Sequence, residues 1–205
     1  MTVDLYKIYE QRRTSCLVPL AERLQAFLTD CLQGEMRIDR ISARAKSTDR
    51  FVGKAEKMTE GQRKYNDPLN QIQDQVGARI VCFYKSDVPV VETKILGYLR
   101  QIENKLLVPD SQSKFGYFGK HLILFFPEDI VESSNRPVPN VFELQIKTLF
   151  QHAWSEAEHD IRYKSSTKID DDFMRKVAFT AAQAWGADMI FDELFAQAQA
   201  ANDAA

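Results

Sequence analysis

The sequence predicts an α/β (α+β) protein with a central mixed β-sheet flanked by α-helices. Two observations lead to this fold class. Short apolar segments rich in strand-forming residues alternate along the chain with longer segments whose apolar residues recur at helical spacing. The 205 residues, 44% hydrophobic and 27% charged, are enough to bury a full core. Such a mixture of elements typically folds as a sheet covered by helices.

The first third of the chain predicts helices around one strand. Apolar residues keep helical spacing over residues 3–33, and Gly34 stands where a helix would end. Residues 40–46 alternate instead, with small or apolar residues on one side and Arg, Ser and Lys on the other. A charged helix is expected near residues 48–58.

The rest of the chain predicts three strands separated by helices. Residues 77–84 form a short apolar segment typical of a strand, and helical spacing follows over residues 90–102. The remaining elements, in chain order, are a strand at 117–126, a loop with Pro and Ser at 128–139, a strand at 140–148, and helices at about 149–162 and 170–199.

Charge and cysteine content restrict the classes of function. A net charge of −2 and a pI near 6.0 argue against a broad non-specific nucleic-acid surface, although they allow a local basic cleft. Three cysteines without CxxC spacing are typical of a reduced compartment. No window approaches the ~20 apolar residues of a membrane span, and the N-terminus lacks a signal peptide's apolar region. We therefore expect a cytoplasmic protein without membrane contact.

The strand at residues 140–148 combines core and polar chemistry. Its alternation places Phe142, Leu144 and Ile146 on one face, and Glu143, Gln145 and Lys147 on the other. A carboxylate and an ammonium group on a largely buried strand are costly unless a metal, a phosphate or each other satisfies them. This strand therefore suggests a phosphate site.

Cations and a second carboxylate could complete such a site. Arg44, Lys46 and Lys54 could converge on a polyphosphate, although a solvated basic surface would explain the same pattern. Asp74 precedes the apolar strand at 77–84 and could bind Mg²⁺ together with Glu143. The alternative is a structural role for Asp74 as the ion-pair partner of Arg79.

Two further segments carry polar chemistry. In residues 114–121, glycines would let a loop approach a ligand, Tyr117 could stack on a nucleobase, and Lys114 could contact phosphate, although a strand-opening turn is the alternative. In residues 151–161, Trp154, Ala157 and Ile161 are expected to be buried, so that His152, Glu156 and His159 line the wet or cleft-facing side rather than hold zinc. The chain has no GxxxxGK[ST], GxGxxG, HExxH or GxSxG motif.

Taken together, these segments resemble the RelA/SpoT synthetase domain. The resemblance spans roughly residues 38–165 and keeps the order and spacing of five motifs. They are Arg44-x-Lys46…Lys54, Asp74-x-x-Gly77-x-Arg79-Ile80, Gly116-Tyr117-x-x-x-His121, Glu143-Leu-Gln-Ile-Lys-Thr148 and His152-Ala-Trp154…Glu158-His159…Tyr163-Lys164. With no hydrolase or regulatory segment attached, the chain is similar to a stand-alone small alarmone synthetase.

The resemblance implies a nucleotidyltransferase-like fold and a GTP pyrophosphokinase activity. Pyrophosphate would pass from ATP to the 3′-hydroxyl of GDP or GTP, giving (p)ppGpp and AMP. We expect one synthetase domain over residues 1–205, with N-terminal helices at 1–34, the synthetase core at 38–165 and a C-terminal helix at 170–199. The implied ligands are ATP, GDP or GTP, and Mg²⁺, and a homo-oligomer is compatible with the family.

The resemblance also implies roles for individual residues. The implied donor residues are Arg44 and Arg79 beside the adenine, Lys46 and Lys54 on the ATP phosphates, and Asp74 with Glu143 on Mg²⁺. The implied acceptor residues are Tyr117, which would stack on the base, and His121, Gln145 and Lys114 as further contacts. Glu143 would ligate the metal, act as general base, or do both, and the sequence leaves these roles open.

The departures from the family pattern gather on the acceptor side. Phe115 replaces the usual Asn, Phe118 and Gly119 replace the usual Arg or Gln and Ser, and Lys147 replaces an Arg that would offer a bidentate fork. On the donor side, Arg50 stands where Ser is usual. Two alternatives therefore stay open: pyrophosphorylation of the 3′ end of tRNA, and a nucleotide-binding regulatory module without catalysis.

Overall fold

The computed structural model describes residues 2–35, 37–109, 114–116, 118–132, 138–164 and 170–204. At its centre is a five-stranded sheet in the order β1-β4-β7-β6-β5. The strands are β1 (Ile38–Ala45), β4 (Val76–Cys82), β7 (Val141–Thr148), β6 (Gly119–Phe125) and β5 (Gln101–Leu107). β4 and β7 are parallel, and the other neighbouring strands are antiparallel. The predicted mixed α/β fold is confirmed.

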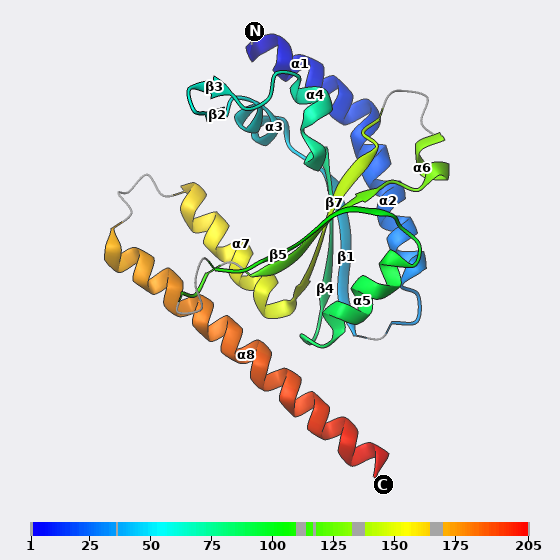
Figure 1. Ribbon diagram of the computed structural model, residues 1–205, viewed down its shortest axis with the longest axis vertical. Coiled ribbons are helices and arrows are strands. Elements are labelled where there is room, and N and C mark those ends of the chain that lie inside the picture. Colours follow the sequence, from blue (N-terminus) through cyan, green and yellow to red (C-terminus); the bar gives the residue numbers. More distant parts are fainter. Residues whose placement is uncertain are drawn as a thin grey trace.

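Helices cover both faces of the sheet (Figure 1). α2 (Val18–Cys31) and α5 (Asp87–Leu96) lie on one side, α7 (Leu149–Lys164) lies on the other, and α8 (Asp171–Asp203) runs alongside α7 and projects beyond it. The alternation predicted for residues 140–148 is confirmed, because Phe142, Leu144 and Ile146 are fully buried under α2 and α5. The other face of β7, with Glu143 and Gln145, is turned toward α7.

The N-terminal helix is continuous from α1 to α2, as the spacing over residues 3–33 predicts. α1 (Thr2–Arg12) leads through one π-helical segment (Arg13–Leu17) into α2. Leu32 follows the last turn of α2, and Gly34 has φ +90°, a conformation that favours glycine, so the chain turns where the sequence indicates.

One aromatic contact fixes the basic segment that follows β1. Tyr9 of α1 stacks on Phe51 of α3 (Thr48–Ala55), with ring centroids 3.7 Å apart and planes 3° from parallel. The Tyr9 hydroxyl also donates to the backbone carbonyl of Lys46, at 3.1 Å. Both rings are fully buried. The positions of Lys46 at the end of β1 and of Lys54 on α3 therefore rest on a packed core contact.

The connection between α3 and β4 consists of short elements. They are the hairpin of β2 (Met58–Thr59) and β3 (Gln62–Arg63), helix α4 (Pro68–Gln71) and a 3₁₀ turn (Gln73–Gln75). The expected helix near 48–58 ends earlier, at Ala55. Asp74 lies in the 3₁₀ turn, two residues before Val76, the first residue of β4.

Three expectations about other segments were wrong. The helix expected over 90–102 ends at Leu96, and residues 101–107 form the edge strand β5. The segment 128–139, expected as a loop, begins with helix α6 (Glu128–Glu132). On α7, Ala157 and Ile161 are exposed and Trp154 is half-buried, whereas Ser155 is buried, because it faces Lys147 of β7. The division into residues 1–34, 38–165 and 170–199 stays a prediction.

No helix within the described ranges has the length and apolar character needed to cross a membrane.

Candidate active site

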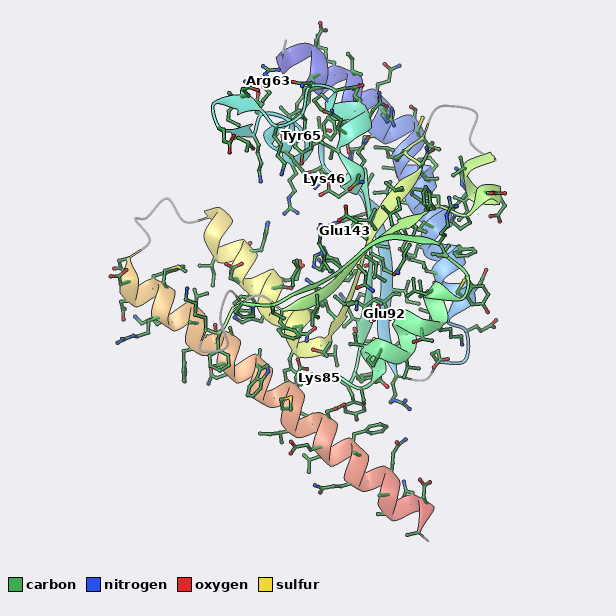
Figure 2. All side chains as sticks on the ribbon, viewed as in Figure 1. Lys46, Arg63, Tyr65, Lys85, Glu92 and Glu143 are labelled. Atoms are coloured by element: carbon green, nitrogen blue, oxygen red, sulfur yellow. The ribbon has the colours of Figure 1, made fainter. Side chains whose placement is uncertain are left out.

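A cleft of about 700 Å³ opens on the face of the sheet that carries Glu143. It is lined by β1, β4, β7 and the turns beside them, with Arg44, Lys46, Asp74, Arg79, Glu143 and Gln145 among its residues. Arg44 is in register with Gly77, and Gly77 is in register with Glu143. Because Gly77 has no side chain, the space between Arg44 and Glu143 is left open. Figure 2 shows Lys46 and Glu143 near the middle of the molecule.

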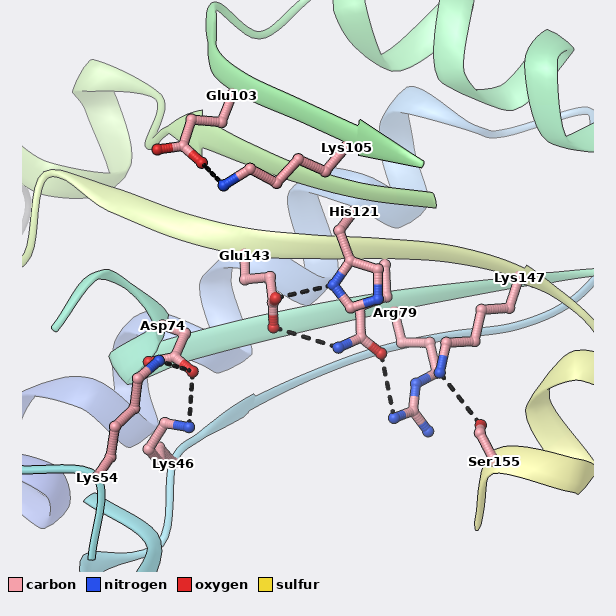
Figure 3. A network of polar contacts seen from close by, with 11 residues as sticks. Lys46, Lys54, Asp74, Arg79, Glu103, Lys105, His121, Glu143, Lys147 and Ser155 are labelled. Carbon is pink, nitrogen blue, oxygen red and sulfur yellow. Dashed lines mark hydrogen bonds and ion pairs between the residues drawn. The ribbon is translucent and has the colours of Figure 1, made fainter. Parts of the chain in front are cut away.

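Asp74 is the centre of a cationic cluster in this cleft (Figure 3). The ammonium groups of Lys46 and Lys54 lie 2.8 and 2.9 Å from the same carboxylate oxygen, Oδ2. Burial alone would raise the pKa of Asp74, but the charges and hydrogen bonds of the two lysines outweigh it and hold the pKa below its ordinary value. Asp74 therefore pairs with these lysines, and the alternative ion pair with Arg79 is wrong.

The second oxygen of Asp74 has no such partner. Oδ1 is buried and accepts no hydrogen bond from any residue that the structure describes. A buried carboxylate oxygen without a donor is costly, and such exceptions call for an unseen ligand or a functional reason.

Glu143 is held by neighbours on β6 and β7. His121 Nδ1 lies 2.9 Å from Glu143 Oε1, and Gln145 Nε2 donates to Oε2 at 3.2 Å. Burial raises the pKa of Glu143, but the hydrogen bond and charge of His121 outweigh it, so the pKa lies below its ordinary value despite the nearby charge of Asp74. Since the carboxylate is ionised, Nδ1 of His121 is the donor.

Arg79 connects this centre to helix α7. Its guanidinium donates to Glu156 Oε1 at 2.6 Å, to His152 Nδ1 at 3.1 Å and to Gln145 Oε1 at 3.4 Å. Burial, and then the charge of Arg79, lower the pKa of His152, which favours the neutral ring that can accept this bond. The expectation that His152 and Glu156 lie on the cleft-facing side of the helix is confirmed.

Lys147 shares the strand face of Glu143 but is almost fully buried. It is 2% exposed, and its ammonium group donates to Ser155 Oγ of α7 at 3.1 Å. Burial, and then the charge of Arg79, lower the pKa of Lys147 to about 8. Lys147 thus braces α7 against the sheet.

The structure brings most of the predicted site residues together. Arg44, Lys46, Lys54, Asp74, Arg79, His121, Glu143 and Gln145 lie in or directly against the cleft. Lys114 does not, because its exposed side chain lines a different pocket, between α7 and α8. Tyr117 lies outside the described residues.

Sequence reasoning missed how α7 supports the site. The bond between Lys147 and Ser155 joins β7 to α7, and the bond between Arg79 and Glu156 joins β4 to α7. The four-residue spacing of His152 and Glu156 indicated that they share a helix face. Spacing within one helix cannot predict which residue of another element they contact.

Comparison with known proteins agrees with this geometry. A family model described as "Region found in RelA / SpoT proteins" matches residues 43–168, which is more than half of the chain. The chain belongs to this family. The matched segment contains all eight predicted site residues that lie in or against the cleft, so the segments that identify the family are the ones that form the site.

Two RelA/SpoT relatives come from Bacillus subtilis (strain 168). GTP pyrophosphokinase YjbM is 24% identical over 172 residues, which cover 82% of this chain and 76% of the relative. GTP pyrophosphokinase YwaC is 28% identical over 144 residues, which cover 67% of this chain and 64% of the relative. Both similarities are distant in sequence but extend over most of the present chain.

Solved structures support the fold. The crystal structure of small alarmone synthetase 1 from Bacillus subtilis matches with a TM-score of 0.72 at 23% identity, covering 88% of this chain and 94% of that one. Small alarmone synthetase 2 from the same organism matches with a TM-score of 0.70 at 24% identity, covering 87% and 94%. At these identities the likeness shows a shared RelA/SpoT-type architecture.

Proposed function

We propose that this chain is a GTP pyrophosphokinase that transfers the β,γ-pyrophosphate of ATP to the 3′-hydroxyl of GDP or GTP. The observation that carries the proposal is the pair of carboxylates, Asp74 and Glu143, that face one cleft beside Lys46 and Lys54. The names of the two Bacillus relatives support it, as do the structures of small alarmone synthetase 1 with its product pppGpp and with AMPCPP.

The two carboxylates also fit a divalent metal, and we propose Mg²⁺. Oδ1 of Asp74 has no partner among the described residues and could serve as an oxygen ligand, and Glu143 supplies a second carboxylate in the same cleft. Mg²⁺ commonly binds one or two carboxylates together with substrate phosphates, so this small protein ligand set is sufficient. When bound, the metal would neutralise negative charge on the phosphates.

The donor end of the cleft would bind ATP mainly by charge. Lys46 and Lys54 would hold the phosphates, because both ammonium groups lie within 3 Å of Asp74, which lines the cleft. Arg44 and Arg79 would flank the adenine. Glu156 and His152 fix the plane of the Arg79 guanidinium, and a fixed plane is what stacking on a base requires.

Glu143 would act as the general base on the acceptor. The 3′-oxygen attacks the β-phosphorus of ATP while the bond from that phosphorus to the α,β-bridging oxygen breaks and AMP leaves. The hydroxyl proton passes to the Glu143 carboxylate, which its lowered pKa keeps ionised at neutral pH. His121 and Gln145 orient the carboxylate through one bond to each oxygen.

The reaction is tested with ATP labelled at the β or γ phosphate and GDP, GTP or deacylated tRNA in separate incubations with Mg²⁺. Labelled ppGpp or pppGpp, formed together with AMP, is the expected result. Label on tRNA alone would replace the proposed acceptor, and ATP binding without transfer to any acceptor would identify a non-catalytic module.

We also propose that the protein acts in the cytoplasm. Cys16, Cys31 and Cys82 are buried free thiols, which suit a reducing compartment. Homo-oligomer formation stays a prediction.

A further inference from the structure

Arg50 of α3 is a cation of the cleft at a position where the family usually has Ser. Its Nη2 lies 3.1 Å from Nε2 of His159 on α7. α3 and α7 lie apart in Figure 1, so this side-chain contact spans the space between them. Arg50 forms no ion pair with a carboxylate that the structure describes. A guanidinium group has five N–H donors, so donors remain for a ligand.

Arg50 shares a face of α3 with Lys54. It precedes Lys54 by four residues, which is about one helical turn. Lys54 Nζ lies 2.9 Å from Asp74 Oδ2, and Asp74 lines the same cleft as Arg50. One face of α3 therefore presents two cations to the cleft, and Lys54 is the one beside the carboxylate.

On its other side, Arg50 neighbours the guanidinium group of Arg44. Burial lowers the pKa of Arg44, and the charges of Arg79 and then of Arg50 lower it further. The charge of Glu156 opposes them. Arg44 is therefore close enough to both other arginines for repulsion. A bound phosphate would relieve it, because its oxygens accept hydrogen bonds from several guanidinium groups at once.

α7 holds two of these arginines from one face. Arg79 donates to His152 and Glu156. Arg50 contacts His159. The three α7 residues recur at spacings of four and three, so they lie on the same side of the helix. The side chain of Arg50 is thus oriented before a ligand binds, which reduces the entropy lost on binding.

We propose that Arg50 binds the α-phosphate of ATP and stabilises AMP as it leaves. In the proposed function, Lys46 and Lys54 hold phosphates beside Asp74, and Arg44 flanks the adenine. The α-phosphate connects the transferred phosphates to the nucleoside. Arg50 occupies the matching place, since Lys54 is its neighbour on one side and Arg44 on the other.

Arg50 acts on the charge that moves in the reaction. As the 3′-oxygen bonds to the β-phosphorus, the bond from that phosphorus to the α,β-bridging oxygen breaks, and its electron pair stays on this oxygen. The oxygen leaves as part of the AMP phosphate, which gains negative charge. N–H donors of Arg50 on the α-phosphate favour this charge more in the transition state than in bound ATP.

This inference rests on the proposed function, because it concerns the leaving group of the same reaction. It also gives a physical reason for one departure from the family pattern. Arg50 places a charged, multidentate donor where the family usually has a neutral hydroxyl group.

AMP and adenosine separate binding of the α-phosphate from binding of the nucleoside, because only AMP carries a phosphate. The intact protein is dialysed to equilibrium against each labelled compound. Arg50→Gln keeps a polar residue with good helix propensity but removes the charge. We expect its affinity for AMP to fall about tenfold or more and its affinity for adenosine to stay unchanged. Arg175→Gln, at an exposed position of α8, is the matched control and should bind both as the wild type does.

The rate of transfer to GDP tests the effect on the leaving group. We expect Arg50→Gln to lower kcat by about 10–100-fold, because a hydrogen bond to a charged group is lost in the transition state. Arg50→Lys keeps the charge and should recover part of the lost kcat. Circular dichroism checks the fold of both variants. A raised KM for ATP with unchanged kcat would overturn the role of Arg50 toward leaving AMP.

Full AMP affinity in Arg50→Gln would overturn the assignment, as would equal losses for AMP and adenosine. If the wild type transfers pyrophosphate to GDP in either case, the proposed function stands and only the role of Arg50 fails. A wild type that binds AMP through Arg50 but transfers to no guanine nucleotide contradicts the proposed function itself.

Discussion

The cleft with Asp74 and Glu143 and the pocket between α7 and α8 differ in how they use charge. In the cleft, Lys46, Lys54 and Asp74 form a charged cluster around one carboxylate oxygen. In the pocket, Trp185 and Phe115 form aromatic walls beside the carboxylate of Asp188. The cleft is therefore suited to anionic groups such as phosphates, whereas the pocket offers mainly ring surface for apolar contact.

The pKa values of the carboxylates follow the same division. The pKa of Asp74 and of Glu143 is lowered, because nearby cations and hydrogen bonds outweigh burial. Burial raises the pKa of Asp188 to about 6, since the bond from Thr148 and the charge of Lys85 offset it only in part and the charge of Asp192 adds to it. The cleft therefore stabilises the negative charges of Asp74 and Glu143, whereas ionisation of Asp188 is energetically unfavourable.

Glu143→Gln tests the catalytic carboxylate and has the largest expected effect. The amide cannot take the hydroxyl proton, so kcat should fall by about 10²–10⁴-fold. Turnover is measured as AMP release with GDP as acceptor, and circular dichroism checks the fold. Glu103→Gln, in an exposed ion pair with Lys105 on β5, is the control and should stay within about twofold of the wild type. Retained turnover in Glu143→Gln contradicts the general-base assignment.

The opposite pKa shifts of Asp188 and Asp74 predict opposite effects on stability. Because the pKa of Asp188 is raised, its contribution to the free energy of unfolding is fully present below pH 3.8 and is lost as the pH rises through about 6. Asp188→Asn should therefore raise the free energy of unfolding at pH 7.5, by up to about 3 kcal/mol, and should lose this advantage near pH 4.

The lowered pKa of Asp74 has the opposite effect on stability. Its contribution to the free energy of unfolding is present at neutral pH and is lost as the pH falls below the ordinary pKa of an aspartate. Asp74→Asn should reduce the free energy of unfolding at pH 7.5 by about 1–3 kcal/mol. Urea unfolding at both pH values measures the two variants. If Asp188→Asn and Asp74→Asn changed the free energy of unfolding at pH 7.5 in the same direction, the two regions would not differ in this way.

Lys54→Met removes one phosphate-binding cation and tests the role of charge at the donor end. We expect the KM for ATP to rise about tenfold or more, with the affinity for GDP unchanged, because a charge-assisted hydrogen bond is lost on one side only. Lys57→Met, three residues further along and exposed, is the control. Equal losses for ATP and GDP would mean that the donor and acceptor ends of the cleft are not separate.

His121→Ala examines the boundary between the donor and acceptor ends of the cleft. Without the bond from Nδ1, burial dominates and raises the pKa of Glu143, so the acid limb of kcat/KM should move to higher pH. His121→Asn keeps an N–H donor and should restore most of the original profile. An unmoved acid limb in His121→Ala would show that His121 does not set the ionisation of Glu143.

Much of the donor end follows from local sequence patterns. The alternation of β7 fixes which face carries Glu143, and the strand and helix around Arg44 and Lys54 have clear periodicity. The strand β5 escaped prediction because it is an edge strand with little burial on either face, and the usual alternation is therefore missing.

The contacts between the sheet and the helices α7 and α8 could not be derived in the same way. Asp188 meets Thr148 across 40 residues, and Arg79 meets Glu156 across 77. Periodicity shows which face of an element is polar, but only the packing of α7 and α8 decides which polar groups meet. Nothing in the spacing around Asp188 distinguishes it from the other acidic residues of its helix.

The boundary of α8 has an evolutionary consequence. The helix begins at Asp171, just after residue 168, where the match to the RelA/SpoT family ends. The carboxylates and lysines of the cleft therefore lie within the matched segment, whereas Asp188, which bonds Thr148 at the end of β7, lies beyond it. Substitutions in α8 can therefore change how this helix is anchored to the sheet without altering a residue of the cleft.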